Sequence, residues 1–129
     1  MGYRSDVAIA VYGDESEMSE FKQYFEEQVK ALPEDQQEWL QGLIEASNVI
    51  TDRELFTDTN MLFQAEDVKW YEGYIIPDMF EKVYRYAPRL GLSAELLRIG
   101  EEYEDIQYDT IGEDCEYALS VTRNIEINL

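Results

Sequence analysis

The segment Ser5 to Tyr12 reads SDVAIAVY, an uninterrupted apolar run from Val7 to Val11 between polar ends. β-Branched residues favour strands, and an apolar run without alternation is typical of a strand that is covered on both faces. Gly13 and Asp14 follow and end the run. We therefore expect a strand over Ser5 to Tyr12 that has packing neighbours on both of its faces.

Two helices are predicted after this strand. The first runs from about Glu15 to Ala31, opens with the capping pair Asp14 and Glu17, and repeats apolar side chains at helical spacing. Those side chains are Met18, Phe21, Phe25, Val29 and Leu32. Pro33 suits the first position of a second helix that ends near Ser47-Asn48. Its apolar face consists of Trp39, Leu40, Leu43 and Ile44.

The remaining segments alternate strand and helix patterns. β-Branched and aromatic residues predict strands near Glu54 to Thr57, Met61 to Glu66, Ala94 to Gly100, Ile106 to Thr110 and Tyr117 to Ile127. A third helix begins at Pro77-Asp78 and stops before Pro88. With no linker or repeat, residues 1–129 form a single α+β domain, a largely antiparallel sheet with about three helices packed on one face. The other face would be open to solvent or to a partner.

Net charge is the strongest functional clue. The 129 residues contain 29 Asp and Glu against 10 Lys and Arg, with no histidine, and the formal charge is −19. Such an excess destabilises a compact state through self-repulsion, while 45% apolar residues argue against disorder. Direct binding of nucleic acid is disfavoured because phosphate contacts need Lys and Arg. A basic protein is the natural partner, attracted at long range and released by salt.

The acids are densest near the C-terminus, in a stretch without Lys or Arg between Arg98 and Arg123. The candidate partner-binding residues are Glu101, Glu102, Glu104, Asp105, Asp109, Glu113, Asp114 and Glu116. On a strand, Glu102 and Glu104 would share a face about 6.6 Å apart, a spacing that permits mimicry of nucleic-acid phosphates. Two alternatives stay open: a solvated acidic surface, and a halophilic host in which acidity has no specific partner.

Several chemistries find no support in the sequence. There is no GxSxG elbow, no phosphate-binding glycine loop and no Cys/His cluster, and no histidine is present as a general base. The acids from Asp109 to Glu116 lack the spacing of an EF-hand loop. Cys115 is expected to be a half-buried small residue rather than a nucleophile. We expect a non-enzyme with no catalytic residue, cofactor or metal site, and no membrane span, located in the cytoplasm.

A second candidate surface is the aromatic segment that contains Trp70, Tyr71 and Tyr74. Aromatic side chains this dense either close the core or form an exposed anchor for a partner, and closing the core is the interpretation we favour.

Three segments resemble a group of small acidic proteins carried by bacteriophages and prophages. They are Met1-Gly2-Tyr3-Arg4-Ser5, Val68-Lys69-Trp70-Tyr71 and Arg98-Ile99-Gly100-Glu101-Glu102-Tyr103-Glu104-Asp105-Ile106. The resemblance is loose between Pro33 and Asn60. It implies a bacterial host cell as the setting and a compact α+β shape, and it names no catalytic residue. Small acidic phage proteins often occupy host nucleic-acid-binding enzymes, including restriction and CRISPR machinery.

Charge and resemblance together predict an interaction protein that binds and blocks a basic, nucleic-acid-binding host protein, as a nucleic-acid mimic or anti-defence inhibitor. The alternative is a non-enzymatic structural or assembly accessory protein, with a homodimer as one form of it, whose acidity only maintains solubility. Its partner would bind through the segment from Trp70 to Ile76 with little dependence on salt. A carboxylate enzyme or a divalent-ion binder is a third interpretation.

Overall fold

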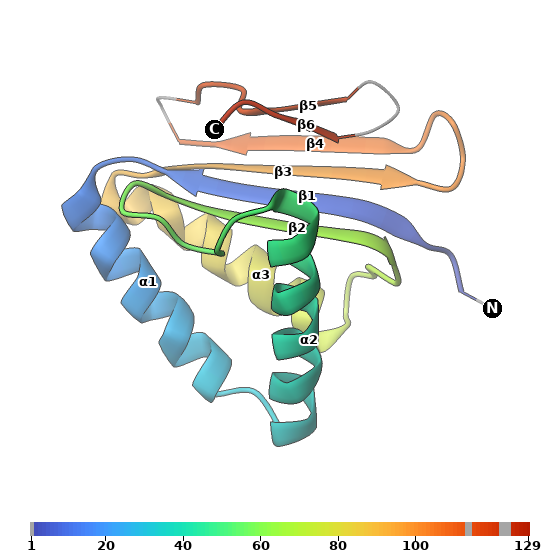
Figure 1. Ribbon diagram of the computed structural model, residues 1–129, viewed down its shortest axis with the longest axis horizontal. Coiled ribbons are helices and arrows are strands. Elements are labelled where there is room, and N and C mark those ends of the chain that lie inside the picture. Colours follow the sequence, from blue (N-terminus) through green and yellow to red (C-terminus); the bar gives the residue numbers. More distant parts are fainter. Residues whose placement is uncertain (1, 113–114, 122–124) are drawn as a thin grey trace.

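The computed structural model describes residues 2–112, 115–121 and 125–129. Within these residues four strands form an antiparallel sheet in the order β2-β1-β3-β4, and three helices cover one of its faces (Figure 1). The fold is α+β. The elements in chain order are β1 (Ser5–Tyr12), α1 (Glu15–Lys30), α2 (Glu34–Thr51), β2 (Asn60–Val68), α3 (Ile75–Tyr86), the 3-10 helix η1 (Ala87–Leu90), β3 (Ser93–Gly100), β4 (Ile106–Ile111), β5 (Leu119–Val121) and β6 (Ile125–Ile127).

Strand β1 lies in the interior of the sheet and is covered on both faces, as its unbroken apolar run predicts. It pairs with β2 on one side and with β3 on the other. Val7, Ile9 and Val11 point to the helices and pack in the main core. Ala8 and Ala10 point to the opposite face, where a second, smaller apolar cluster lies. Alternate side chains of one strand therefore supply both cores.

The strand pair β5–β6 covers the sheet face that lies away from the helices. Ala118 and Leu119 are buried against Ala8, Ala10 and other residues of that face. Figure 1 shows the helices on one side of the sheet and β5 and β6 on the other. The expectation that this face is open to solvent or to a partner is therefore wrong. The small side chains of Ala8 and Ala10 let the C-terminal segment approach closely.

Glu95 on β3 is a fully buried carboxylate within this second layer. The phenol of Tyr108 donates a hydrogen bond to Oε1 at 2.5 Å, and the phenol of Tyr12 donates to Oε2. The backbone N–H groups of Ala118 and Leu119 donate to Oε2 and Oε1 at 2.9 and 3.3 Å. Because all four partners are donors, they complement an ionised carboxylate, which only accepts hydrogen bonds.

The Glu95 carboxylate thereby joins β1, β4 and the start of β5. Tyr12 extends the connection, because its phenol oxygen accepts the N–H of Glu116 at 2.6 Å. Burial, followed by the hydrogen bond to Glu95, raises the pKa of Tyr12 and of Tyr108 above the ordinary value of about 10. An isolated buried charge costs several kcal/mol, whereas this one has a full set of donors and fastens the C-terminal segment to the sheet.

The structure differs from several expected element boundaries. Residues Glu54 to Thr57 form no strand, and only a single bridge joins Phe56 to Met61. One strand over Tyr117 to Ile127 is also wrong, because β5 and β6 pair antiparallel with each other. Helix α2 continues to Thr51 because Ser47 is buried in it and its hydroxyl oxygen accepts a hydrogen bond from the backbone N–H of Gln64 at 2.9 Å. Asp14 makes no side-chain capping bond to α1.

Replacing Glu95 by Gln is expected to lower the free energy of unfolding by about 1 to 3 kcal/mol, since the new amide places N–H donors against N–H and O–H donors. Urea denaturation followed by tryptophan fluorescence measures the change. Glu104→Gln, the same replacement at an exposed position, is the control and is expected to have little effect. Equal stability of the Glu95→Gln and wild-type proteins would contradict the role assigned to this carboxylate.

Candidate functional site

The candidate acidic residues do not lie on a single face. Glu101, Glu102 and Glu104 are exposed in the turn between β3 and β4, and we call them the acidic turn. Asp105 follows this turn and Asp109 lies on β4, both half-buried. Glu116 contacts Tyr12 at the other end of the sheet, so the length of β4 separates it from the acidic turn. Glu113 and Asp114 lie outside the described residues.

The expected strand spacing of Glu102 and Glu104 is wrong, because β3 ends at Gly100 and β4 begins at Ile106. Both acids lie in the turn, where side chains do not alternate between two faces. A regular row of carboxylates that copies the phosphate repeat is therefore absent from this turn.

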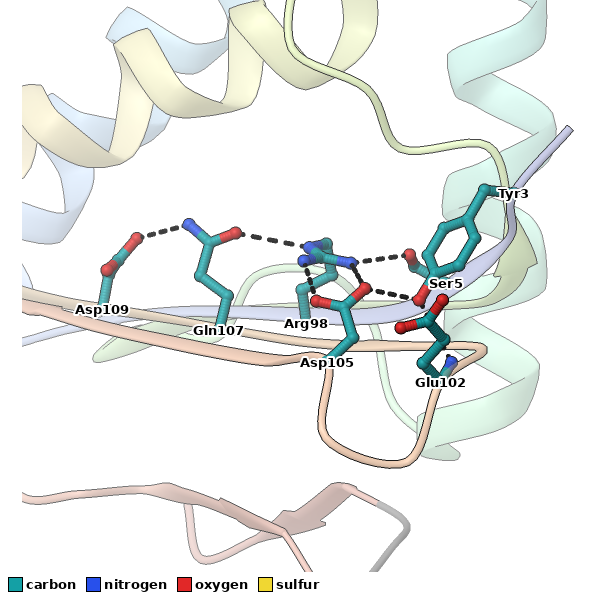
Figure 2. Close-up of polar contacts among 7 residues, drawn as sticks. All are labelled: Tyr3, Ser5, Arg98, Glu102, Asp105, Gln107 and Asp109. Carbon is teal, nitrogen blue, oxygen red and sulfur yellow. Dashed lines mark hydrogen bonds and ion pairs between the residues drawn. The ribbon is translucent and has the colours of Figure 1, made fainter.

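A polar network fixes the base of the acidic turn (Figure 2). The guanidinium of Arg98 donates to both carboxylate oxygens of Asp105, at 2.8 and 3.2 Å, and to the hydroxyl of Ser5 at 3.1 Å. Gln107 accepts a further bond from Arg98 Nε at 3.3 Å and donates to Asp109 at 2.8 Å. This bidentate geometry matches the planar guanidinium to the carboxylate and fixes both side chains.

Tyr3 connects the network to the turn itself. Its phenol donates to Asp105 Oδ2 at 2.5 Å and accepts the backbone N–H of Glu102 at 3.1 Å. A Cβ at Gly100 would overlap the Asp105 carboxyl group and the Tyr3 phenol, so this close approach requires glycine. The hydrogen bond from Arg98, and then that from Tyr3, lower the pKa of Asp105 below its ordinary value.

Two further acids lie near the acidic turn, and the sequence analysis missed them. Strand pairing places Asp6 opposite Ile99, and Asp6 Oδ1 accepts the N–H of Asp67 at 3.0 Å. The backbone N–H of Arg4 donates to Glu101 at 3.1 Å, while its guanidinium donates to the Asp67 carbonyl at 3.0 Å. Asp6 and Asp67 thus join the acidic turn at one end of the sheet, and we call the five residues Asp6, Asp67, Glu101, Glu102 and Glu104 the acidic end. Only antiparallel pairing brings these positions together.

A cavity of about 200 Å³ lies beside the network, between α3 and the strands β3 and β4. Its walls include the rings of Trp70 and Tyr84 and the carboxylate of Glu81. Arg98 also lines it, but its guanidinium is already bonded to Ser5, Asp105 and Gln107. The cavity therefore presents acidic and aromatic groups rather than a cation that is free for a ligand.

The aromatic segment divides between core and surface. Trp70 packs against Phe63 and Phe80, with ring centroids 6.1 and 5.7 Å apart, in agreement with the core interpretation. Tyr71 is half-buried and donates its phenol to the Tyr3 carbonyl at 2.7 Å. Tyr74 is exposed and stacks edge-on against Tyr71. Of the three residues Trp70, Tyr71 and Tyr74, Tyr74 alone is largely accessible to a partner.

Other features restrict the possible chemistry of the described residues. The lone Cys115 is half-buried and lies 3.5 Å from the carbonyl oxygen of Ile111. Among the residues that the structure describes, no three cysteine or acidic side chains come close enough to hold a metal ion. In the same part of the chain no helix has both the length and the apolar character needed to cross a bilayer.

Comparison of the chain with protein-family models, with curated proteins and with solved structures gives no match. The resemblance to small acidic phage proteins stays a prediction, and the function must be argued from the surfaces described above.

Replacing Arg98 by Met is expected to raise the pKa of Asp105 towards its ordinary value and to lower the free energy of unfolding by about 1 to 3 kcal/mol, because a bidentate bond to a charged group is lost. In the wild type, the lowered pKa of Asp105 stabilises the fold above the unfolded value of about 3.9, and this contribution is lost as the pH falls below it. Carboxyl-detected NMR titration follows Asp105, and urea denaturation follows stability.

Arg85→Met is the matched control for this measurement. Arg85 forms an exposed ion pair with Glu81 one helical turn away, at 3.1 Å, and such pairs contribute about 0.5 kcal/mol or less. An unchanged Asp105 titration in the Arg98→Met protein would show that the network does not act as described.

Proposed function

We propose that this protein is a phage-type acidic interaction protein that binds a basic, nucleic-acid-binding host protein and blocks it by occupying its cationic surface. The acidic end is the proposed contact, and Tyr103, which is 77% exposed within the same turn, adds aromatic contact area. Electrostatic attraction steers the encounter, and steric overlap with the nucleic-acid site inhibits the partner.

The observation that carries the proposal is how little of the acidic charge is neutralised within the molecule. Between residues that the structure describes, ion pairs join Arg98 to Asp105 and Arg85 to Glu81. Most other carboxylates are exposed on helices, turns and strand ends, and Glu95 is compensated by neutral donors. Among the residues that the structure describes, most of the excess negative charge therefore faces solvent, where a cationic surface can reach it.

The acidic end is favoured over other acidic segments because its geometry is fixed. The Arg98–Asp105–Tyr3 network holds the backbone at Glu102, and Arg4 bonds to Glu101 and Asp67. A preorganised group loses less conformational entropy on binding than a mobile one. We propose competition by charge at this end, rather than imitation of a regular phosphate row.

A second candidate function is a structural or assembly accessory protein whose acidity maintains solubility. The distribution of acids supports it, since α1 and α2 also carry many exposed carboxylates away from the acidic end. Exposed apolar side chains at Trp39, Tyr74 and Ile75 support it as well. A protein of this kind would bind partners with little dependence on salt.

Reversing the charge of the acidic turn, by Glu101→Lys, Glu102→Lys and Glu104→Lys together, is expected to abolish capture of the basic partner from a bacterial lysate. Immobilised wild-type protein is expected to retain a nucleic-acid-binding protein at low salt and to release it as salt rises. Mass spectrometry identifies the eluted protein, and inhibition of its nucleic-acid binding by the purified chain tests the blocking step.

The matched control reverses three exposed acids of α1, Glu20, Glu26 and Glu27, to Lys. It changes the net charge equally but leaves the acidic end intact, so we expect it to retain the partner. Equal loss of partner capture in the two variants would indicate that binding depends on total charge rather than on the acidic end. Full retention by the acidic-turn variant at low salt would exclude the acidic end as the contact.

A further inference from the structure

Helix α2 carries a second apolar stripe that its own fold buries only in part. Trp39, Leu43, Ala46 and Ile50 follow one another at intervals of four, three and four residues, the spacing of a helix–helix seam. Between Leu40 and Thr51 the only charged residue is Glu45, although 30% of the whole chain is charged. An uncharged apolar stripe in so acidic a protein indicates a surface that is covered in use.

The structure leaves most of this stripe outside the core: Trp39, Ala46 and Ile50 are exposed, whereas Leu43 is half-buried and packs against the edge of the main core. Leu40 and Ser47, on a neighbouring side of the helix, are the buried residues of α2. Trp39 is 44% exposed and Val49 is 81% exposed, so the expectation that Trp39 belongs to the same apolar face as Leu40 is wrong. At about 100° per residue, Trp39 and Leu40 lie on different sides of the helix. In Figure 1 α2 stands at one margin of the helical layer.

Small residues at the centre of the stripe permit close approach of another helix. Ala46 is exposed, and a Cβ added at Gly42 would have no atom within 4 Å. Larger side chains, Trp39 at one end and Val49 and Ile50 at the other, border this flat centre. Such a surface suits packing against a second α-helix.

The two flanks of the stripe carry opposite charges. Glu38 and Glu45 lie on one flank of α2, by their helical positions. On the other flank, a groove is lined by Arg4, Gln36, Trp39, Leu43, Val68, Lys69, Gly73, Tyr74 and Ile75. Arg4 and Lys69 therefore border the stripe on the side opposite to the two acids. Among the described residues, the ammonium group of Lys69 forms no ion pair.

We propose that a second copy of this chain covers the α2 stripe, with the two α2 helices parallel about a two-fold axis that runs along them. In a parallel pair, one flank of each helix meets the opposite flank of the other. Glu38 and Glu45 of each copy then face Lys69 and Arg4 of its partner. An antiparallel pair would bring acids against acids, and the charge pattern selects the parallel arrangement.

Self-association through α2 is expected to respond to salt in the opposite way from binding of the basic partner. The dimer proposal does not depend on the proposed function. Two bodies of charge −19 repel each other, and salt screens that repulsion while leaving apolar burial in place. Self-association should therefore persist or strengthen as salt rises, whereas binding to a basic partner weakens. Failure of one proposal is thus distinguishable from failure of the other.

Sedimentation equilibrium of the full chain, over a series of protein concentrations at low and high NaCl, tests the proposal. The mass is expected to rise from 15.2 kDa towards that of two copies. Ala46→Glu places two like charges at the centre of the seam, and we expect it to weaken dimerisation by about tenfold or more. Gln41→Glu adds the same charge on the polar side of α2 and should dimerise like the wild type.

The orientation is tested by cysteine cross-linking in a Cys115→Ser background. Ile50→Cys is expected to form a disulfide between identical positions, because parallel helices bring equivalent residues together. Circular dichroism checks that each variant keeps its fold. A wild-type protein that stays monomeric throughout, or an Ala46→Glu protein that dimerises as well as the wild type, would overturn the proposal. Cross-links only between Ile50→Cys and Trp39→Cys proteins would overturn the parallel arrangement.

Discussion

Repulsion among the acidic side chains is the constraint under which this chain folds. With 29 acids and 10 bases in 129 residues, carboxylates cannot be paired one to one with cations. The structure keeps most of them exposed on helices, turns and strand ends, where water screens their interaction. Folding then depends on the two apolar layers on either side of β1, which must outweigh both chain entropy and repulsion.

Glu95 and Asp105 show two ways in which this chain accommodates acids away from bulk water. Glu95 is surrounded by neutral donors, two phenols and two backbone N–H groups, and it joins the C-terminal segment to the sheet. Asp105 is bound by Arg98, so one of few bases is used to shape the acidic turn. The molecule therefore has two surfaces of different physical character. The exposed acids form a surface that attracts cations, and the stripe of α2 forms an apolar surface without charged side chains.

The sequence predicted those parts of the fold that depend on neighbouring residues. The unbroken run Ser5 to Tyr12 gave the correct bounds of β1 and its burial on both faces, and the amphipathic stripe of α1 was equally informative. The pairing of β5 with β6 and the single bridge at Phe56 were missed, because short strands depend on packing more than on local composition.

The candidate site was less predictable, for the same physical reason. Glu95 is the same residue type as the surface glutamates, so the sequence does not distinguish it from them. Its hydrogen-bond partners lie 83, 13, 23 and 24 residues away. Asp6 and Asp67 reach the acidic turn only through strand pairing. Trp39 and Leu40 are adjacent in sequence but lie on different sides of α2, a distinction that helical geometry alone would have shown.

The most direct test of this account is the free energy of unfolding as a function of NaCl concentration. Urea is the suitable denaturant, because guanidinium chloride is itself a salt, and a fixed low protein concentration limits self-association. The Debye screening length falls from about 10 Å at 0.1 M salt to about 3 Å at 1 M. If the acidic side chains repel one another in the folded state, salt weakens this repulsion, and the free energy of unfolding is expected to rise with the salt concentration. Stability that stays constant or falls would show that the negative charge is compensated within the fold, and that a cationic partner is not needed to relieve it.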